Sequence, residues 1–253
     1  MTKTAYSRRV ILALWGTIAL FLAFCFLFLY VCTDVFDLFF ADPAPGYRAA
    51  VSLAAFAPPD RKTVVLDAGH GGYDSGARSA SGVLEKDLNL AITKKIAAYL
   101  SLYDVRVVLT RSGDEPPKNQ DNTSRKRAEI LSRVKIAEDA EPDLVLSIHM
   151  NSFPQEKCAG AQVFYSGCVG RSEVFAATLR EALCTLVQPE NTRSAKETDS
   201  ILLLSRLNVP AALLECGFLS NEDEVRLLTD ENYQSRLSFA AASAILTFLY
   251  PTT

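Results

Sequence analysis

From residue 61 onward, apolar residues follow two different periods, and the two periods alternate along the chain. Short apolar, β-branched runs predict buried strands at residues 63–66, 105–109, 144–148, 161–165, 201–204 and 211–214. Apolar residues at helical spacing predict helices at residues 86–103, 124–140, 172–187, 221–228 and 231–249. Strands that alternate with helices of this length indicate an α/β fold. We therefore expect a single layered α/β domain with a mostly parallel, twisted sheet flanked by helices.

A different pattern stands at the N-terminus, where residues 10–32 are almost entirely apolar and carry no charge. As a helix they would span about 34 Å, which exceeds the roughly 30 Å core of a bilayer. The charged residues that precede this stretch are all basic, which keeps the N-terminus in the cytoplasm under the positive-inside rule. We expect a cytoplasmic tail at 1–9, one transmembrane signal anchor at 10–32, a proline-containing linker at 33–60 and an extracytoplasmic domain at 61–253. A cleaved signal peptide is the alternative, although its apolar region is usually shorter.

The composition narrows the class of protein further. The chain has 26 basic and 29 acidic residues and a net charge of -3, so it lacks the basic field that a nucleic-acid partner requires. Four of its six cysteines follow residue 60. Export permits a disulfide between Cys158 and Cys168, the only pair close in sequence. Four free, mostly buried thiols are the simpler interpretation.

Polar residues follow three of the predicted strands directly. The only two histidines, His70 and His149, come after the strands at 63–66 and 144–148, and Glu215 ends the strand at 211–214. In an open α/β sheet, ligands bind at the carboxyl ends of the strands. A single histidine at such a position is usually structural, but both histidines of a chain falling there favours a functional site.

Two imidazoles and one carboxylate form a known catalytic zinc site. Glu85, at the start of the helix 86–103, is the best third ligand, and Asp74 and Asp87 are alternatives. The alternative role for Glu85 is a carboxylate that stabilises the helix dipole. Glu215 should be half-buried at the sheet edge, where desolvation raises the carboxyl pKa and suits a proton shuttle. A buried salt bridge is the alternative for this residue.

Four motifs in order carry a resemblance to a known family. DAGHGGYDSGA, LEKDLNL, SIHMNS and LLECGFLSNEDE together resemble the zinc-dependent N-acetylmuramoyl-L-alanine amidases, which cut the glycan–peptide link of bacterial peptidoglycan. The resemblance covers residues 63–249 and implies one Zn²⁺ per chain on His70, Glu85 and His149, with Glu215 as the catalytic carboxylate. Arg133 matches a recurrent arginine of the family. Ala68 and Glu138 depart from the frequent proline and asparagine, and neither position is a ligand.

The anchor, the absence of a wall-binding repeat and the core GAQVFYSG…ECGFLSN most resemble the amidases that prepare spore cortex for muramic-δ-lactam formation. The resemblance implies hydrolysis of the amide between the lactyl group of N-acetylmuramic acid and L-alanine, by water activated at zinc. It also implies an enzyme held at the cell or forespore membrane, with peptidoglycan as substrate and an activator protein as a further candidate partner. Two alternative functions are an inactive, membrane-tethered peptidoglycan-binding adaptor and a zinc peptidase acting within the stem peptide.

Overall fold

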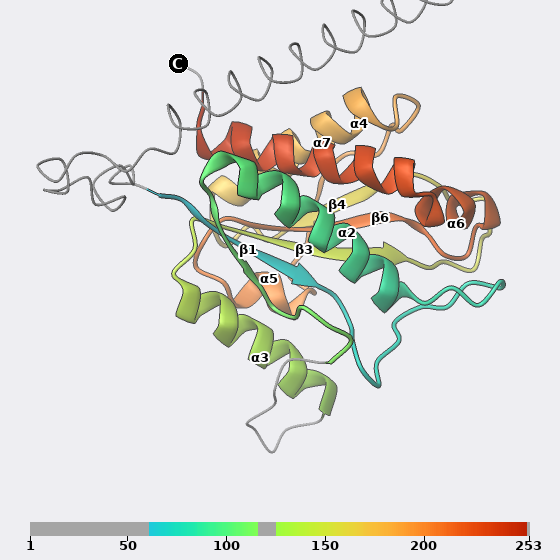
Figure 1. Cartoon of the computed structure of the whole chain (residues 1–253), viewed down its shortest axis with the longest axis horizontal. Helices are drawn as coiled ribbons and strands as arrows, with labels where there is room; N and C mark the ends of the chain where they lie inside the picture. The colour runs from blue at the N-terminus through green and yellow to red at the C-terminus, as the bar shows by residue number, and fades with distance from the viewer. Residues whose placement is uncertain (1–60, 116–124, 252–253) are drawn as a thin grey trace, which may run out of the picture. The chain divides into compact units, whose positions relative to one another are not determined.

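The centre of the structure is a six-stranded sheet with the strand order β2-β1-β3-β6-β4-β5 (Figure 1). The computed structural model describes residues 61–115 and 125–251, which lie in the compact unit Pro59–Thr253. β4 pairs antiparallel with β6, and the other described pairings are parallel. This confirms the expected α/β domain with a mostly parallel sheet. The strands are β1 (Thr63–Ala68), β2 (Arg106–Leu109), β3 (Leu144–Asn151), β4 (Gln162–Tyr165), β5 (Lys196–Glu197) and β6 (Ala211–Phe218).

Helices cover both faces of the sheet and divide the core into two layers. α2, α4 and α7 lie on one face, and α3 and α5 lie on the other (Figure 1). α6 connects β6 to α7 and adds its apolar side to the first layer. The helices are α2 (Glu85–Leu100), followed by the 3-10 turn η2 (Ser101–Tyr103), α3 (Arg125–Ala140), α4 (Arg171–Leu186), α5 (Leu202–Arg206), α6 (Glu222–Thr229) and α7 (Glu231–Leu249).

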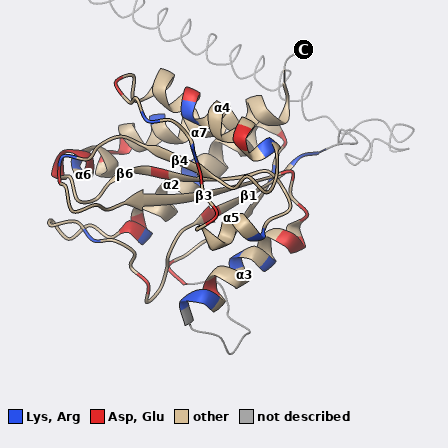
Figure 2. Cartoon of the chain, turned by 180° about the vertical axis from the view of Figure 1, so that it is seen from behind, with Lys and Arg blue, Asp and Glu red and all other residues tan. Residues whose placement is uncertain are grey.

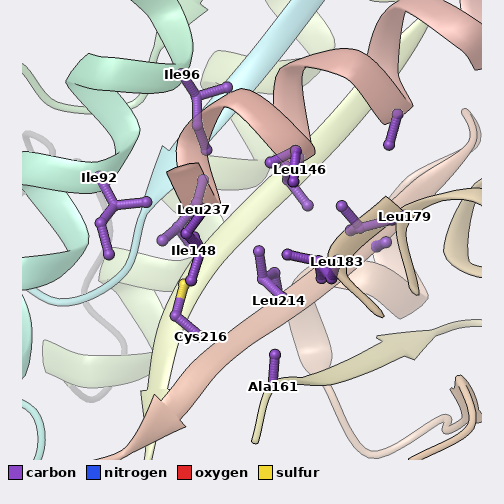
Figure 3. Close-up of a cluster of buried hydrophobic side chains, with 14 of the residues drawn as sticks. Ile92, Ile96, Leu146, Ile148, Ala161, Leu179, Leu183, Leu214, Cys216 and Leu237 are labelled. Carbon is purple, nitrogen blue, oxygen red and sulfur yellow. The ribbon is translucent and has the colours of Figure 1, made fainter. Parts of the chain in front are cut away.

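The alternation of side chains along each strand decides which layer a residue joins. Val64 and Leu66 pack in the α2/α4/α7 layer, whereas Val65 packs against α3 and α5. Successive residues on a strand point to opposite faces, and strands that are buried on both faces have nearly continuous apolar sequences. Figure 3 shows the larger layer, where side chains of β3 and β6 meet those of α2, α4 and α7: Leu146, Ile148, Leu214, Ile92, Ile96, Leu179, Leu183 and Leu237.

The prediction of a strand at residues 201–204 is wrong, because this segment begins the helix α5 (Leu202–Arg206). Leu203 and Leu204 are consecutive and both buried, and a short apolar run of this kind does not distinguish a strand from a buried helix. The edge position next to β4 is occupied by β5 instead. The two residues of β5 are exposed, so the sequence did not predict a strand there.

The strands β3 and β6 extend beyond their predicted ends, to Asn151 and Phe218. Their parallel pairing continues through His149 opposite Glu215 and resumes, after a register shift, at Asn151 opposite Phe218. His149 and Glu215 therefore lie within strands and not after them. Both belong to the face covered by α3 and α5, since they alternate with Ile148 and Leu214 of the other layer.

The expected membrane anchor at 10–32 and the linker at 33–60 lie outside the described residues. Within residues 61–115 and 125–251, the structure contains no helix with the length and apolarity that a bilayer crossing requires.

The cysteines of the described domain are free thiols, namely Cys158, Cys168, Cys184 and Cys216. Cys216 is completely buried among apolar side chains of the larger layer (Figure 3), and burial raises the pKa of its thiol well above the ordinary value. It therefore packs as a small apolar group on the face of β6 opposite to Glu215.

Candidate metal centre

Three side chains from three elements converge at the carboxyl end of the parallel strands. His70 lies in the loop after β1, Glu85 is the first residue of α2, and His149 lies near the end of β3. Glu85 Oε1 lies 3.1 Å from His70 Nε2 and 2.9 Å from His149 Nδ1. One donor atom from each residue lies within 4.8 Å of the others. The structure thus brings together the three side chains that the sequence analysis grouped.

Two glycines allow these side chains to approach so closely. A Cβ at Gly69 would overlap the imidazole of His149, and a Cβ at Gly76 would overlap both the Glu85 carboxylate and the His70 ring. Gly76 also has a φ of 65°, a left-handed conformation that glycine adopts without a steric penalty. The close packing of the three donors therefore depends on the absence of side chains at these two positions.

The donor set fits a zinc ion. Donors placed at about 2.0–2.2 Å from a tetrahedral zinc lie about 3.4 Å from one another, close to the separations of Glu85 from the two imidazoles. Burial raises the pKa of Glu85, but hydrogen bonds from His149 and His70 hold that pKa well below its usual range. The carboxylate is therefore ionised, as a metal ligand must be.

Asp74 orients His70 from the side opposite to Glu85. His70 Nδ1 lies 2.8 Å from Asp74 Oδ2, which leaves Nε2 to face Glu85. Burial lowers the pKa of His70, but the hydrogen bonds that its ring donates to the carboxylates of Glu85 and Asp74 raise it on balance. A carboxylate on the outer nitrogen of a metal-binding histidine fixes its tautomer and ring orientation. Asp74, an alternative ligand in the sequence analysis, is thus placed to support a ligand.

Two buried arginines hold the backbone that carries His70. Arg133 Nη1 donates to the Ala68 carbonyl at 2.7 Å, and its Nη2 donates to the His70 carbonyl at 2.6 Å. Arg111 donates to the carbonyls of Ala68 and Gly69 at 2.9 and 3.1 Å. His70 itself has a φ of 61°, which is uncommon for a residue with a side chain. The two guanidinium groups therefore stabilise a strained backbone at a candidate ligand.

Asp67 connects this loop to the sheet. Its carboxylate accepts hydrogen bonds at 2.6 Å from Arg133 Nη1, Thr110 Oγ1 and Ser147 Oγ. Burial raises the pKa of Asp67, but the Arg133 charge and these hydrogen bonds lower it to about 2. A buried carboxylate is tolerated only when it is paired in this way.

Glu215 lies beside the three donors on the adjacent strand β6, opposite His149. Its Oε2 is buried and has no hydrogen-bond partner among the described residues, and the same holds for Oε1 of Gln162, its antiparallel partner on β4. Burial raises the pKa of Glu215 to about 7; the Glu85 charge also raises it, and His149 opposes the shift. Glu215 is therefore a separate carboxylate with a free oxygen and a pKa suited to proton transfer.

The remaining candidates of the sequence analysis have distinct positions. Asp87 is exposed and does not join the three donors. Glu138, at a departure from the family pattern, is exposed near the end of α3. No motif singles out Arg111, whose only signal in the sequence is its position just after the strand ending at Leu109. Its contacts with residues 42 and 43 positions earlier could not be inferred from spacing.

Comparisons with known proteins identify the family of this chain. The family model N-acetylmuramoyl-L-alanine amidase (Amidase_3) matches residues 64–247. A germination-specific N-acetylmuramoyl-L-alanine amidase of Bacillus subtilis is 36% identical over 194 residues, covering 76% of this chain and 81% of the relative. The amidase AmiA of Escherichia coli is 28% identical over 233 residues, covering 75% of this chain and 77% of the relative.

A solved structure extends the likeness to three dimensions. The CwlD amidase from Clostridioides difficile, determined in complex with the GerS lipoprotein, is 38% identical with a TM-score of 0.71. The match covers 75% of this chain and 98% of that chain. The family model spans most of the described domain and includes all four candidate site residues. This chain belongs to the Amidase_3 family of N-acetylmuramoyl-L-alanine amidases.

Proposed function

We propose that this protein hydrolyses the amide bond between the lactyl group of N-acetylmuramic acid and L-alanine in peptidoglycan. The observation that carries the proposal is the convergence of His70, Glu85 and His149 beside a separate carboxylate, Glu215. Membership of the amidase family supports the choice of this bond over a peptide bond within the stem. The four intact site residues also favour an enzyme over an inactive adaptor.

The three donors would hold one Zn²⁺ per chain through His70 Nε2, Glu85 Oε1 and His149 Nδ1, the atoms that face one another. When bound, zinc would lower the pKa of a water molecule and polarise a carbonyl oxygen. The protein contributes the ligand geometry, since Asp74 fixes the His70 ring and the two arginines fix its backbone.

Glu215 would move the proton. Its free Oε2 accepts a proton from the water that attacks the lactyl carbonyl carbon. It then returns that proton to the departing nitrogen of L-alanine, so that a carboxylate and an amine are formed. The pKa of Glu215 is about 7 without a metal. The charge of a bound cation would lower it and so favour the ionised base at neutral pH.

The relatives and the N-terminal sequence support a proposal for the biological setting. A germination-specific amidase and an amidase bound to a lipoprotein support a role in spore cortex maturation and an activator protein as partner. Residues 10–32 would anchor the chain in the cell or forespore membrane, with residues 1–9 in the cytoplasm, 33–60 as linker and 61–253 as the extracytoplasmic catalytic domain.

Digestion of purified peptidoglycan by the zinc-loaded, full-length protein tests the reaction. We expect fragments whose new N-terminus is L-alanine and glycan strands with free lactyl carboxylates, both identified by mass spectrometry. A different stem residue at the new N-terminus would indicate a peptidase. Binding to peptidoglycan without any fragment would indicate the adaptor.

The metal assignment has its own test in Glu85→Ala. This change removes one of three donors, so we expect the dialysed variant to retain far less than one zinc per chain, while the wild type retains one. Atomic absorption measures the metal content, and circular dichroism checks the fold. Asp87→Ala is the matched control because that carboxylate lies in the same helical turn and is exposed. Equal zinc content in wild type and Glu85→Ala would contradict the assignment.

A further inference from the structure

A cavity of about 270 Å³ opens beside the candidate metal centre, on the face of the sheet that α3 and α5 cover. Its lining includes His70 and His149 of the candidate metal centre and Asp74, which supports His70. Its volume is below the roughly 300–1,000 Å³ of a complete ligand pocket, so it suits one part of a larger substrate. The lining also includes an aliphatic wall made of Ile130, Ile201, Leu202, Leu203 and Leu213.

Among the described residues that line this cavity, one basic side chain is available to bind a ligand. Three carboxylates border it, and each accepts a hydrogen bond from a buried or half-buried side chain: Asp67 and Glu129 from Arg133, and Asp74 from His70. Lys126, in the first turn of α3, also lines the cavity and is exposed. It makes no hydrogen bond or ion pair with another described residue, although its charge acts on Asp74. Figure 2 shows the basic first turn of α3.

The residues that line the cavity indicate which side of the scissile amide it binds. One side carries the sugar and the other carries the stem peptide. Among the described residues, no Phe, Tyr or Trp lines the cavity to stack on a sugar ring. Aliphatic side chains favour the burial of alkyl groups, and an ammonium group favours a carboxylate. This combination matches a short acidic peptide better than a glycan.

We propose that this cavity is the subsite for the stem peptide, and that Lys126 binds the free carboxylate of the residue after L-alanine. The aliphatic wall then contacts the methyl and methylene groups next to the scissile bond. The assignment rests on the proposed amidase function and adds a preference for stems that carry a free carboxylate at this residue.

Two soluble muramoyl tripeptides that differ at one group test the subsite. The residue after L-alanine carries its free carboxylate in one peptide and a carboxamide in the other. For the zinc-loaded, full-length wild type we expect kcat/KM to be about tenfold higher for the carboxylate, the effect of one charge-assisted hydrogen bond. Lys126→Gln should remove this preference by raising KM for the carboxylate peptide with little change in kcat. Lys126→Glu should reverse the preference.

Lys135→Gln is the matched control, because Lys135 lies on the same helix, pairs with Asp139 and does not line the cavity. It should keep the wild-type preference. Leu202→Gln places a polar group in the aliphatic wall and should raise KM for both peptides by a similar factor. Equal kcat/KM of the wild type for the two peptides, or an unchanged preference in Lys126→Gln, overturns the subsite alone. Failure to cleave either peptide overturns the amidase function together with it.

Discussion

Replacing Glu215 with glutamine is expected to lower kcat by about 10²–10⁴-fold, the usual contribution of a general acid–base group. Glutamine has nearly the same shape but neither accepts nor returns a proton. Since Glu215 is not one of the three donors, the variant should bind zinc with wild-type stoichiometry. Steady-state kinetics on a soluble muramoyl peptide measure the first effect, and atomic absorption measures the second.

Glu215→Gln should also change how the stability of the metal-free protein depends on pH. Burial raises the pKa of Glu215 to about 7 from its ordinary 4.5. The folded state therefore holds the proton more tightly, and stability falls as pH rises from about 4.5 through 7. The loss amounts to about 3 kcal/mol at most. Glutamine cannot ionise, so metal-free Glu215→Gln should melt above the wild type at pH 8 and close to it at pH 4.

The control for both measurements is Glu181→Gln, an exposed carboxylate on α4, which should leave kcat and the melting profile unchanged. Wild-type turnover in Glu215→Gln would remove this residue from the reaction. A pH-independent difference in melting temperature would show that Glu215 remains ionised in the metal-free fold.

The helices with a long apolar stripe and the strands with continuous apolar residues could be predicted from the sequence. α7 was predicted at its observed bounds because ten of its nineteen residues are buried along a long helical stripe. The ends of β3 and β6 were missed because the residues that continue them, His149 and Glu215, are polar. They remain in the strands because the two backbones continue to pair there. Pairing between distant segments leaves no signal in the local sequence, so the predicted strands ended too early.

The same limit applies to the site. The positions of His70, His149 and Glu215 at strand ends could be inferred because parallel strands bring their carboxyl ends to one edge. Glu85 remained one of three carboxylates until the structure placed it between both imidazoles. The support of the His70 loop by Arg111 and Arg133 could not be predicted, since it depends on rotamers and on backbone carbonyl directions.

Arg133→Met is expected to destabilise the metal-free protein by about 3–5 kcal/mol, the cost of leaving one member of a buried ion pair without its partner. The side chains of Arg133 and Asp67 are 5% and 2% exposed and lie 2.6 Å apart. Loss of the guanidinium also releases the carbonyls of Ala68 and His70. We therefore expect zinc affinity to fall by about 10–100-fold, as for other groups that orient a ligand.

Two further variants separate the charge of Arg133 from its geometry. Arg133→Lys keeps the charge near Asp67 but lacks the planar fork that reaches the carboxylate and both carbonyls. It should therefore recover part of the stability and little of the zinc affinity. Adding Asp67→Asn to Arg133→Met removes the unpaired charge, so the double variant should be less destabilised than the sum of the single changes. Urea unfolding and competition with a zinc chelator measure the two quantities, with the exposed Arg127→Met as control. Strict additivity of the two changes would show that Arg133 and Asp67 are not coupled. Wild-type zinc affinity in Arg133→Lys would show that the guanidinium does not position His70.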